Sequence, residues 1–302
     1  MRNRLAVLAG LACLQLSGCS LSPPTGPATA EAPPDPAAAA RGAVLASAAG
    51  CVGCHWDKAD GGAAFAGGKP VETPFGAYYS RNITPDPDHG IGRWSDRDFL
   101  AALRTGIAPG GGHYFPAFPY PSFTGMTDQD LLDIRAYLRS QPPSAAPNRP
   151  HEVSFPFDMR ASMLFWRALY FEEGPLRPDP AQSAEWNRGA YLVNAVGHCS
   201  ECHTPRTALG GPDRSRFLNG AMLAGAKPKR APNITPDTAD GIGAWNVGQI
   251  ADLLKTGMTP KGDFISAPMA EVVEGTAKLS DADRRAIAIY LKTLPPLPGK
   301  GG

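Results

Sequence analysis

The sequence carries almost no excess of charge. Its 302 residues include 29 Lys and Arg against 28 Asp and Glu, which gives a formal net charge of +1. This balance does not indicate nucleic-acid binding, which favours a basic surface. No stretch reaches the ~18 consecutive apolar residues of a membrane-spanning helix. Strand-like alternation of apolar and polar residues is also scarce, which favours helices over sheets.

Cysteine is sparse as well, and all the cysteines fall into three short segments. Of the six Cys, Cys13 and Cys19 lie near the N-terminus. The other four form two strings of the pattern C-x-x-C-H, at Cys51–His55 and Cys199–His203. No cysteine therefore remains for a disulfide framework.

C-x-x-C-H is the attachment motif of a c-type haem: the thiols add to the porphyrin vinyl groups, and the histidine becomes the proximal ligand of the iron. Two motifs imply two covalently bound haem c groups and electron transfer. A zinc site needs further ligands at close range, and the two motifs lie far apart in the sequence. A thioredoxin-like pair does not require a following histidine twice. The residues expected to hold the haems are Cys51, Cys54, His55, Cys199, Cys202 and His203.

The N-terminus resembles an export signal. Arg2 and Arg4 precede an apolar stretch over Leu5–Leu16, which is shorter than the ~20 residues needed to cross a bilayer. The stretch ends in Leu16-Ser17-Gly18-Cys19, which resembles the bacterial lipobox. This resemblance implies cleavage before Cys19, which would then carry acyl chains. An ordinary signal peptide that contains a cysteine is the alternative.

We therefore expect residues 1–18 to be a lipoprotein signal peptide and residues 19–39 to be a tether rich in Ala and Pro. Export agrees with the two haem motifs, because c-type haem is attached outside the cytoplasm. The expected location is the periplasm, with the mature chain anchored to a membrane by its lipid.

The chain contains an internal duplication that extends beyond the haem motifs. We expect two homologous domains, 40–141 and 185–296, joined by a linker with a helix over 142–184. The linker helix is expected over Asp158–Phe171 and between the domains. The matching strings are Arg41–Ala43 with Arg188–Ala190, Asn82–Asp86 with Asn233–Asp237, Gly90–Trp94 with Gly241–Trp245, and Leu103–Gly106 with Leu254–Gly257.

Helix signals fall at matching places in the two copies. Cap-like pairs open a middle helix and a last helix in each domain. Gly42 and Gly189 are expected to let the first and last helices cross closely. With 34 Gly and 32 Pro, the chain is expected to be rich in loops. Each domain is thus predicted to be all-α and wrapped around one covalent haem. The cap pairs are Ser95 with Asp98, Asn246 with Gln249, Thr127 with Asp130, and Ser280 with Asp283.

Further strings resemble one protein family. They are His198–Arg206, Trp186–Leu192, Pro116–Tyr120, and Phe155-Pro156-Phe157 with Arg160. With them the chain resembles the cytochrome c subunits of bacterial periplasmic membrane-associated dehydrogenases, which act on alcohols, gluconate or aldehydes. The resemblance covers about residues 40–296. It implies two tandem class I cytochrome c domains that relay electrons from a dehydrogenase catalytic subunit to a respiratory-chain acceptor. The best-known members carry three haems, whereas this chain has two motifs.

The sixth ligand of the second haem is expected to be Met269. An electron-transfer haem commonly has a second axial ligand such as Met. Met269 lies in the loop leading into the last helix, where the resemblance places the ligand. Met258 is the rival candidate, but it corresponds to Ile107 of the first copy and is interpreted as structural.

The first copy departs from the family pattern. Members often have Pro-Ala-Met-Pro-Tyr where this chain has Pro116–Tyr120, so that Phe118 replaces the ligand. Three options remain for the first haem. Met126 is preferred, an open sixth position comes second, and His113 comes third.

This choice separates two functions. Two six-coordinate haems favour electron relay, whereas an open first haem with an acid or base above it would favour a diheme peroxidase-like enzyme. We expect electron relay and no catalytic activity of the chain itself. Arg206, Trp94 and Trp245 are expected to contact haem propionates, because guanidinium and indole N–H groups suit a buried carboxylate. Core packing is an equally good explanation for the two Trp.

Overall fold

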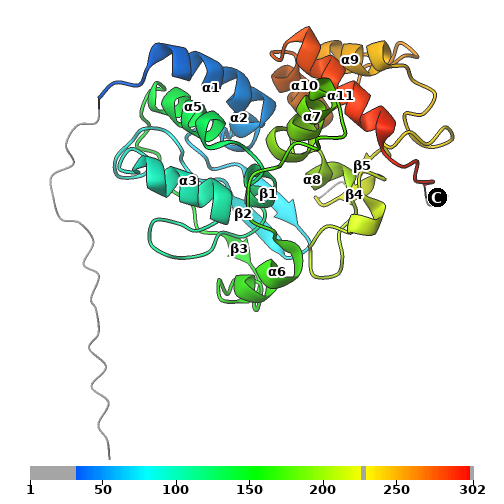
Figure 1. Cartoon of the computed structure of the whole chain (residues 1–302). Coiled ribbons are helices and arrows are strands. Elements are labelled where there is room, and N and C mark those ends of the chain that lie inside the picture. The colour runs from blue at the N-terminus through cyan, green and yellow to red at the C-terminus, as the bar shows by residue number, and fades with distance from the viewer. Residues whose placement is uncertain (1–31, 226–228, 300–302) are drawn as a thin grey trace, which may run out of the picture. The chain divides into compact units, whose positions relative to one another are not determined.

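The computed structural model describes residues 32–225 and 229–299. By its internal contacts the chain divides into two units, and Pro33–Gly302 form the second, which contains all the elements named below (Figure 1). Among the described residues, no helix has the length and apolar character needed to cross a membrane.

Most of the expected export segment lies outside the described residues. This applies to the predicted signal peptide, 1–18, to the lipidation site Cys19, and to the tether up to residue 31. The first helix begins at Pro36, so the final residues of the predicted tether, 19–39, are helical. Asp35 caps this helix, since its carboxylate accepts hydrogen bonds from the backbone N–H groups of Ala37 and Ala38.

The first half of this unit is built from short helices and a small sheet. Its elements are α1 (Pro36–Ala48), α2 (Cys51–Cys54), β1 (Pro70–Thr73), β2 (Gly76–Tyr79), α3 (Asp96–Thr105), α4 (Tyr120–Phe123) and α5 (Asp128–Arg139). The linker adds β3 (Glu152–Val153) and α6 (Ser162–Tyr170).

The second half repeats this order of helices. Its elements are α7 (Ala184–Tyr191), the π-helix η1 (Leu192–Val196), α8 (Ser200–His203), the 3-10 helix η2 (Arg214–Arg216), β4 (Ala221–Leu223), β5 (Lys229–Ala231), α9 (Val247–Thr256), α10 (Met269–Thr276) and α11 (Asp281–Thr293).

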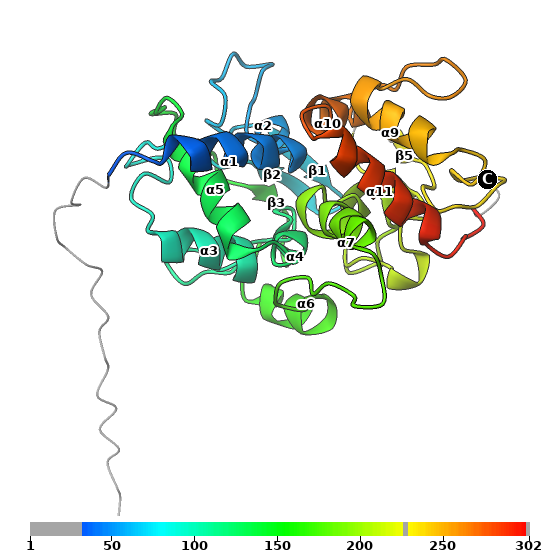
Figure 2. The ribbon, with the colours of Figure 1, turned by 45° about the horizontal axis from the view of Figure 1, so that its top comes forward.

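In each half the first helix crosses the last one, as α1 does on α5 and α7 on α11 (Figure 1 and Figure 2). A Cβ on Gly42 would overlap the carbonyl of Asp133, and one on Gly189 would overlap the carbonyl of Ala286. The predicted close crossing is therefore confirmed. Beside the first crossing, Nε of Arg41 lies 2.6 Å from Oδ2 of Asp133.

The four predicted helix starts are confirmed. Ser95 and Asp98 form a complete capping box at α3, as do Asn246 and Gln249 at α9. In the remaining two caps, the side-chain hydroxyl accepts a hydrogen bond from the backbone N–H of the residue three positions later. These are Thr127 at α5 and Ser280 at α11.

The expected all-α class needs a correction, because the described residues also contain short strands. β2 pairs with both β1 and β3 in one antiparallel sheet, and β4 pairs with β5 in a second. No named strand is longer than four residues. Alternation over so few residues is too short to recognise in a sequence.

The linker helix α6 packs on the first half. Met163 and Trp166 are buried in an apolar cluster with Tyr78, Phe115 and Tyr120. A contact with the second half comes from the end of this helix, where the Tyr170 hydroxyl lies 3.0 Å from that of Thr207. Met159, just before this helix, is exposed.

Candidate haem-attachment sites

The first attachment motif forms a single helical turn. Gly50 adopts a left-handed conformation with φ of 64°, which ends α1 and redirects the chain into α2. The turn carries Cys51 and Cys54, and His55 caps its end. The imidazole Nδ1 of His55 lies 2.6 Å from the carbonyl oxygen of Arg81.

The second motif has the same construction. His198 takes the place of Gly50 and also has a positive φ, of 37°. Cys199 caps α8, which carries Cys202 and His203. The Nδ1 of His203 lies 2.8 Å from the carbonyl oxygen of Pro232.

These histidines suit the role of proximal iron ligand. Because a carbonyl oxygen only accepts, Nδ1 of each ring must donate, and the lone pair is then on Nε2. Burial lowers the pKa of both His55 and His203, which favours the neutral ring that a metal needs. A hydrogen bond from the second ring nitrogen also orients a ligand and raises its basicity.

The cysteines are also suited to covalent attachment. Cys51, Cys54, Cys199 and Cys202 are free thiols in the structure. Burial raises the pKa of Cys51 and of Cys199 to about 12, so both remain protonated thiols near neutral pH. Thiols rather than disulfides are required for addition to the vinyl groups of a haem.

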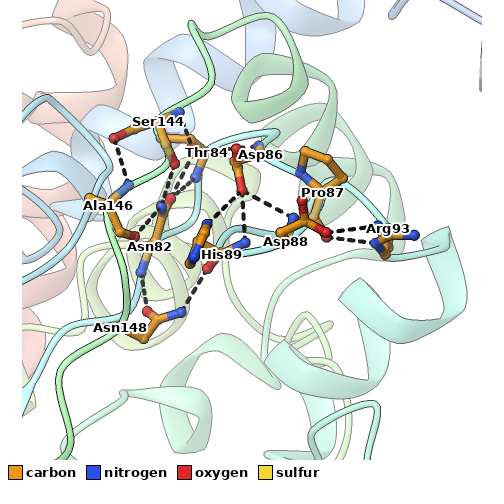
Figure 3. A network of polar contacts seen from close by, with 10 residues as sticks. All are labelled: Asn82, Thr84, Asp86, Pro87, Asp88, His89, Arg93, Ser144, Ala146 and Asn148. Atoms are coloured by element: carbon orange, nitrogen blue, oxygen red, sulfur yellow. Dashed lines mark hydrogen bonds and ion pairs between the residues drawn. The ribbon is translucent and has the colours of Figure 1, made fainter.

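The repeated Asn-Ile-Thr-Pro-Asp string supports the loop that contacts His55. The buried Asn82 follows Arg81 directly, and its Oδ1 accepts hydrogen bonds from the backbone N–H and hydroxyl of Thr84 (Figure 3). Its Nδ2 donates to the carbonyls of Ser144 and Ala146, at 2.8 and 3.0 Å. The string therefore fastens the loop that holds His55 to the segment after α5.

The second copy repeats this support. Asn233 follows Pro232, and its Oδ1 accepts hydrogen bonds from the backbone N–H and hydroxyl of Thr235. Its Nδ2 donates to the carbonyl of Leu297, 2.8 Å away, in the segment after α11. His55 and His203 are thus each held by a loop that is fastened to the chain beyond the last helix.

The two motifs lie close to each other. Burial, and after it the Glu201 carboxylate, raises the pKa of the Cys202 thiol, and Cys54 of the first motif is near enough to add a smaller effect in the same direction. The Nζ of Lys69 donates to the carbonyl of Gly53, 2.7 Å away, inside the first motif. It also lies 3.1 Å from the carboxylate of Glu271 on α10, which belongs to the second half.

Two further contacts connect the halves in a matching way. α10 packs on α1, where a Cβ on Gly275 would overlap the carbonyl of Ser47. α4 packs on η1, where a Cβ on Gly125 would lie 3.0 Å from the Cβ of Ala195. Ser47 and Ala195 are equivalent, since each lies four residues before the first cysteine of its motif. The segment before the last helix of each half therefore packs beside the motif of the other half.

Comparison with known proteins gives the family. The cytochrome c family model matches residues 39–142 and 187–295, one match around each motif. This chain belongs to the cytochrome c family. It is 43% identical over 270 residues to a diheme cytochrome c-type protein of Cereibacter sphaeroides, with 86% of each chain covered. The family and this diheme relative show that the cytochrome carries two covalently bound haem c groups.

Other relatives are subunits of dehydrogenases. The cytochrome is 41% identical to the fructose dehydrogenase cytochrome subunit of Gluconobacter japonicus, covering 87% of this chain and 54% of that one. It is 38% identical to the gluconate 2-dehydrogenase cytochrome c subunit of Pantoea cypripedii, covering 84% of this chain and 59% of that one. The predicted resemblance to such subunits is confirmed, although the cytochrome spans less than two thirds of their length.

The methionines predicted as sixth ligands lie in different surroundings. Met269 is partly buried at the start of α10 and packs against the main apolar core. Met126 is 0% exposed, and its backbone carbonyl accepts a hydrogen bond from Arg104. It directly precedes the cap of α5, and the residue in the same place before α11 is the buried Leu279.

Two more residues bear on the sixth ligand of the first haem, namely His113, the third option, and Phe118, which replaces the family's Met. Phe118 packs edge-on against Tyr114, with ring centroids 5.4 Å apart, and lies within an aromatic cluster. In the described part of the chain, the Nδ1 of His113 is buried without a hydrogen-bond partner. The carbonyl of His113 accepts a hydrogen bond from Arg160, 2.6 Å away.

The predicted propionate ligands each have protein contacts. The guanidinium of Arg206 pairs with the carboxylate of Glu201 inside the second motif. Trp94 and Trp245 are partly buried and pack against the apolar core. The propionate role of these three residues stays a prediction.

The backbone carbonyls of Arg81 and Pro232, which hold the rings of His55 and His203, were not predicted from the sequence. A signal was present, because each residue directly precedes a copy of the repeated Asn-Ile-Thr-Pro-Asp string. Lys69 and Glu271 were also missed, since their pairing depends on how the two halves meet.

Proposed function

We propose that the chain is a diheme electron-relay cytochrome that takes electrons from a dehydrogenase catalytic subunit and passes them to a respiratory-chain acceptor. A haem c iron supplies reversible one-electron exchange between its ferric and ferrous states. The observation that carries the proposal is the position of the two attachment motifs, which adjoin each other across the contact between the halves. The relatives named as dehydrogenase cytochrome subunits support the choice of electron donor.

In this function the protein holds each proximal histidine rigid. Cys51, Cys54 and His55 would attach and ligate the first haem, and Cys199, Cys202 and His203 would do so for the second. The hydrogen bonds from the two Nδ1 atoms fix the orientation of the rings. Rigid ligands keep reorganisation small when the iron changes its charge, which suits rapid electron exchange.

For the sixth ligands we propose Met269 at the second haem and Met126 at the first. Support for Met126 is its complete burial just before α5 and the absence of another Met among residues 40–141. The competing explanation is a core role, because Leu279 occupies the same place in the second half. Met126→Leu should make one haem high-spin and able to bind carbon monoxide. If the wild-type protein already binds carbon monoxide at one haem, the position is open, and Met126 is not the ligand.

A peroxidase-like function would need an open first haem with an acid or base above it. The relatives described above are named as cytochromes or cytochrome subunits, and no observation favours this alternative.

The relay is tested in the producing bacterium. Deletion of the gene should abolish oxygen uptake with one substrate among alcohols, gluconate and fructose, while dye-linked dehydrogenase activity in the same cells persists. A plasmid copy should restore uptake, and the double variant Cys199→Ala, Cys202→Ala should lack one haem and fail to restore it. Unchanged oxygen uptake with every substrate after deletion would refute the proposal.

We also propose that the mature protein is a periplasmic lipoprotein anchored through Cys19. The proposal rests on the lipobox-like string in the sequence. Cys19→Ala should release the protein from membranes or block its processing, while both haems are retained. Equal membrane association of the variant would contradict the anchor.

A further inference from the structure

The two copies differ by one residue just before the haem motif. Arg41 precedes Cys51 by ten residues, whereas the equivalent Arg188 precedes Cys199 by eleven. In the first half, α1 is a regular α-helix up to Ala48. In the second, α7 passes into the π-helix η1, whose wider turn accommodates the extra residue. A π-turn within a helix is uncommon and is frequently found at functional sites.

The chain leaves this π-turn at His198, which adopts the left-handed conformation that Gly50 has in the other copy. Histidine tolerates this region better than most residues, but glycine is the usual choice. The side chain gained in this way reaches the first half. Its Nε2 lies 3.1 Å from the carbonyl oxygen of Ala49, to which it must donate. Its ring also packs edge-on against Phe123, with centroids 5.5 Å apart.

Ala49 lies two residues before Cys51, and His198 lies directly before Cys199. The hydrogen bond between them therefore joins the two haem-attachment segments. From one attachment cysteine to the other, the path consists of covalent bonds and this single hydrogen bond. Electron tunnelling decays more slowly along covalent and hydrogen bonds than across a gap without contact.

We propose that His198 is a positioning residue for electron exchange between the two haems, through its hydrogen bond to the carbonyl of Ala49. The inference rests on the proposed relay function and names a residue that controls its internal step. The link is made from one side only, because Gly50, the counterpart of His198, has no side chain. Removal of the His198 side chain therefore deletes this hydrogen bond and the ring contact with Phe123, and no matching link on the other side replaces them.

The test uses the purified diheme protein. Laser-flash reduction of the ferric form, followed by absorbance, measures the rate at which the haems exchange an electron. His198→Gly should fold, since the equivalent Gly50 tolerates the same backbone conformation. It should keep both haems and exchange electrons several-fold more slowly. His198→Gln should largely restore the exchange rate, because its amide nitrogen reaches a similar position with a donor.

A matched control removes another polar contact between the halves. The hydroxyl of Tyr170, at the end of the linker helix, lies 3.0 Å from that of Thr207 in the second half, and neither residue is a proposed haem ligand. Tyr170→Phe should reduce stability but leave the exchange rate unchanged. Equal slowing in Tyr170→Phe and His198→Gly would show a general loosening of the contact and overturn the inference.

The failures of the two proposals are distinguishable. If the wild-type protein exchanges electrons between its haems and His198→Gly does so at the same rate, the inference about His198 is wrong and the relay function stands. If the wild-type protein itself shows no exchange, the internal step of the relay fails, and the role of His198 fails with it.

Discussion

Asn82 connects the stability of the first half with the properties of its haem. Its side chain is 2% exposed and takes part in four hydrogen bonds, two to Thr84 and one each to the carbonyls of Ser144 and Ala146. Asn82→Ala removes all four and leaves buried partners without hydrogen bonds. The loop that places the Arg81 carbonyl against His55 loses its attachment to the segment after α5.

The expected loss follows from these four contacts. At a net 0.5–1.5 kcal/mol for each hydrogen bond, Asn82→Ala should cost about 4 kcal/mol of unfolding free energy. With roughly 2–4 °C per kcal/mol for a chain of this size, the melting temperature should fall by about 8–16 °C. A looser hydrogen bond from Nδ1 makes the His55 ring less basic, which disfavours the ferric state. The potential of the first haem should therefore rise, and that of the second should not change.

The measurements are thermal unfolding by circular dichroism and a spectroelectrochemical titration of the purified diheme protein. Mass spectrometry confirms that both haems are present. Asn233→Ala is the matched control, because it removes the equivalent support in the second half and should move the potential of the other haem. If Asn82→Ala melts within about 2 °C of wild type, a shift smaller than that of a single 1 kcal/mol contact, the network does not stabilise the loop. A shift of both potentials in one variant would show that the support is not specific to one haem.

Three further predictions concern other parts of the structure. Gly189→Ala should lower the unfolding free energy by about 1–2 kcal/mol in a denaturant titration, because forcing α7 from α11 outweighs the ~1 kcal/mol gain in helix propensity; an unchanged midpoint would show that the crossing is not tight. Met269→His should keep both haems and sharply lower the potential of one, whereas Met258→His, at an exposed position, should not. The hydrogen bond from Arg41 lowers the pKa of the buried Asp133 carboxyl. The ion pair therefore stabilises the fold above about pH 4, the usual range of a free Asp. This stability is lost as the pH falls through the lower pKa of Asp133 in the folded state. The difference in stability between wild type and Asp133→Asn should shrink at acid pH, and a constant difference would contradict this role.

The helix starts and the close helix crossings could be predicted from the sequence because they depend on local chemistry. A cap such as Ser95 accepts a hydrogen bond from a backbone N–H only three residues away. Gly42 indicates a close helix contact because it has no side chain. The haem motifs are equally local, since both cysteines and the histidine lie on one turn. For these features, spacing in the sequence is close to spacing in the structure.

Other features depend on the meeting of distant segments. The short strands carry too few residues for a periodic pattern, and β3 pairs with β2 across most of the first half. The side-chain oxygen of Asn148 accepts a hydrogen bond from the backbone N–H of Asn82, 66 residues away. No local sequence pattern indicates such a partner. The extra residue between Arg188 and Cys199 can be seen in the sequence. The contact of His198 with Ala49 cannot, because it depends on the π-turn and on how the two halves pack. The haem-attachment residues could therefore be predicted from the sequence, whereas the contacts between distant segments that support them could not.

The matching contacts between the halves have a consequence for symmetry. The segment before the last helix packs beside the opposite motif twice, with Gly275 against Ser47 and Gly125 against Ala195. Two copies of a subunit in a two-fold symmetric homodimer meet in this way, through the same segments on both sides. Here the two copies belong to one polypeptide and differ in sequence, so one side can carry a residue that the other lacks, as His198 stands where the first copy has Gly50.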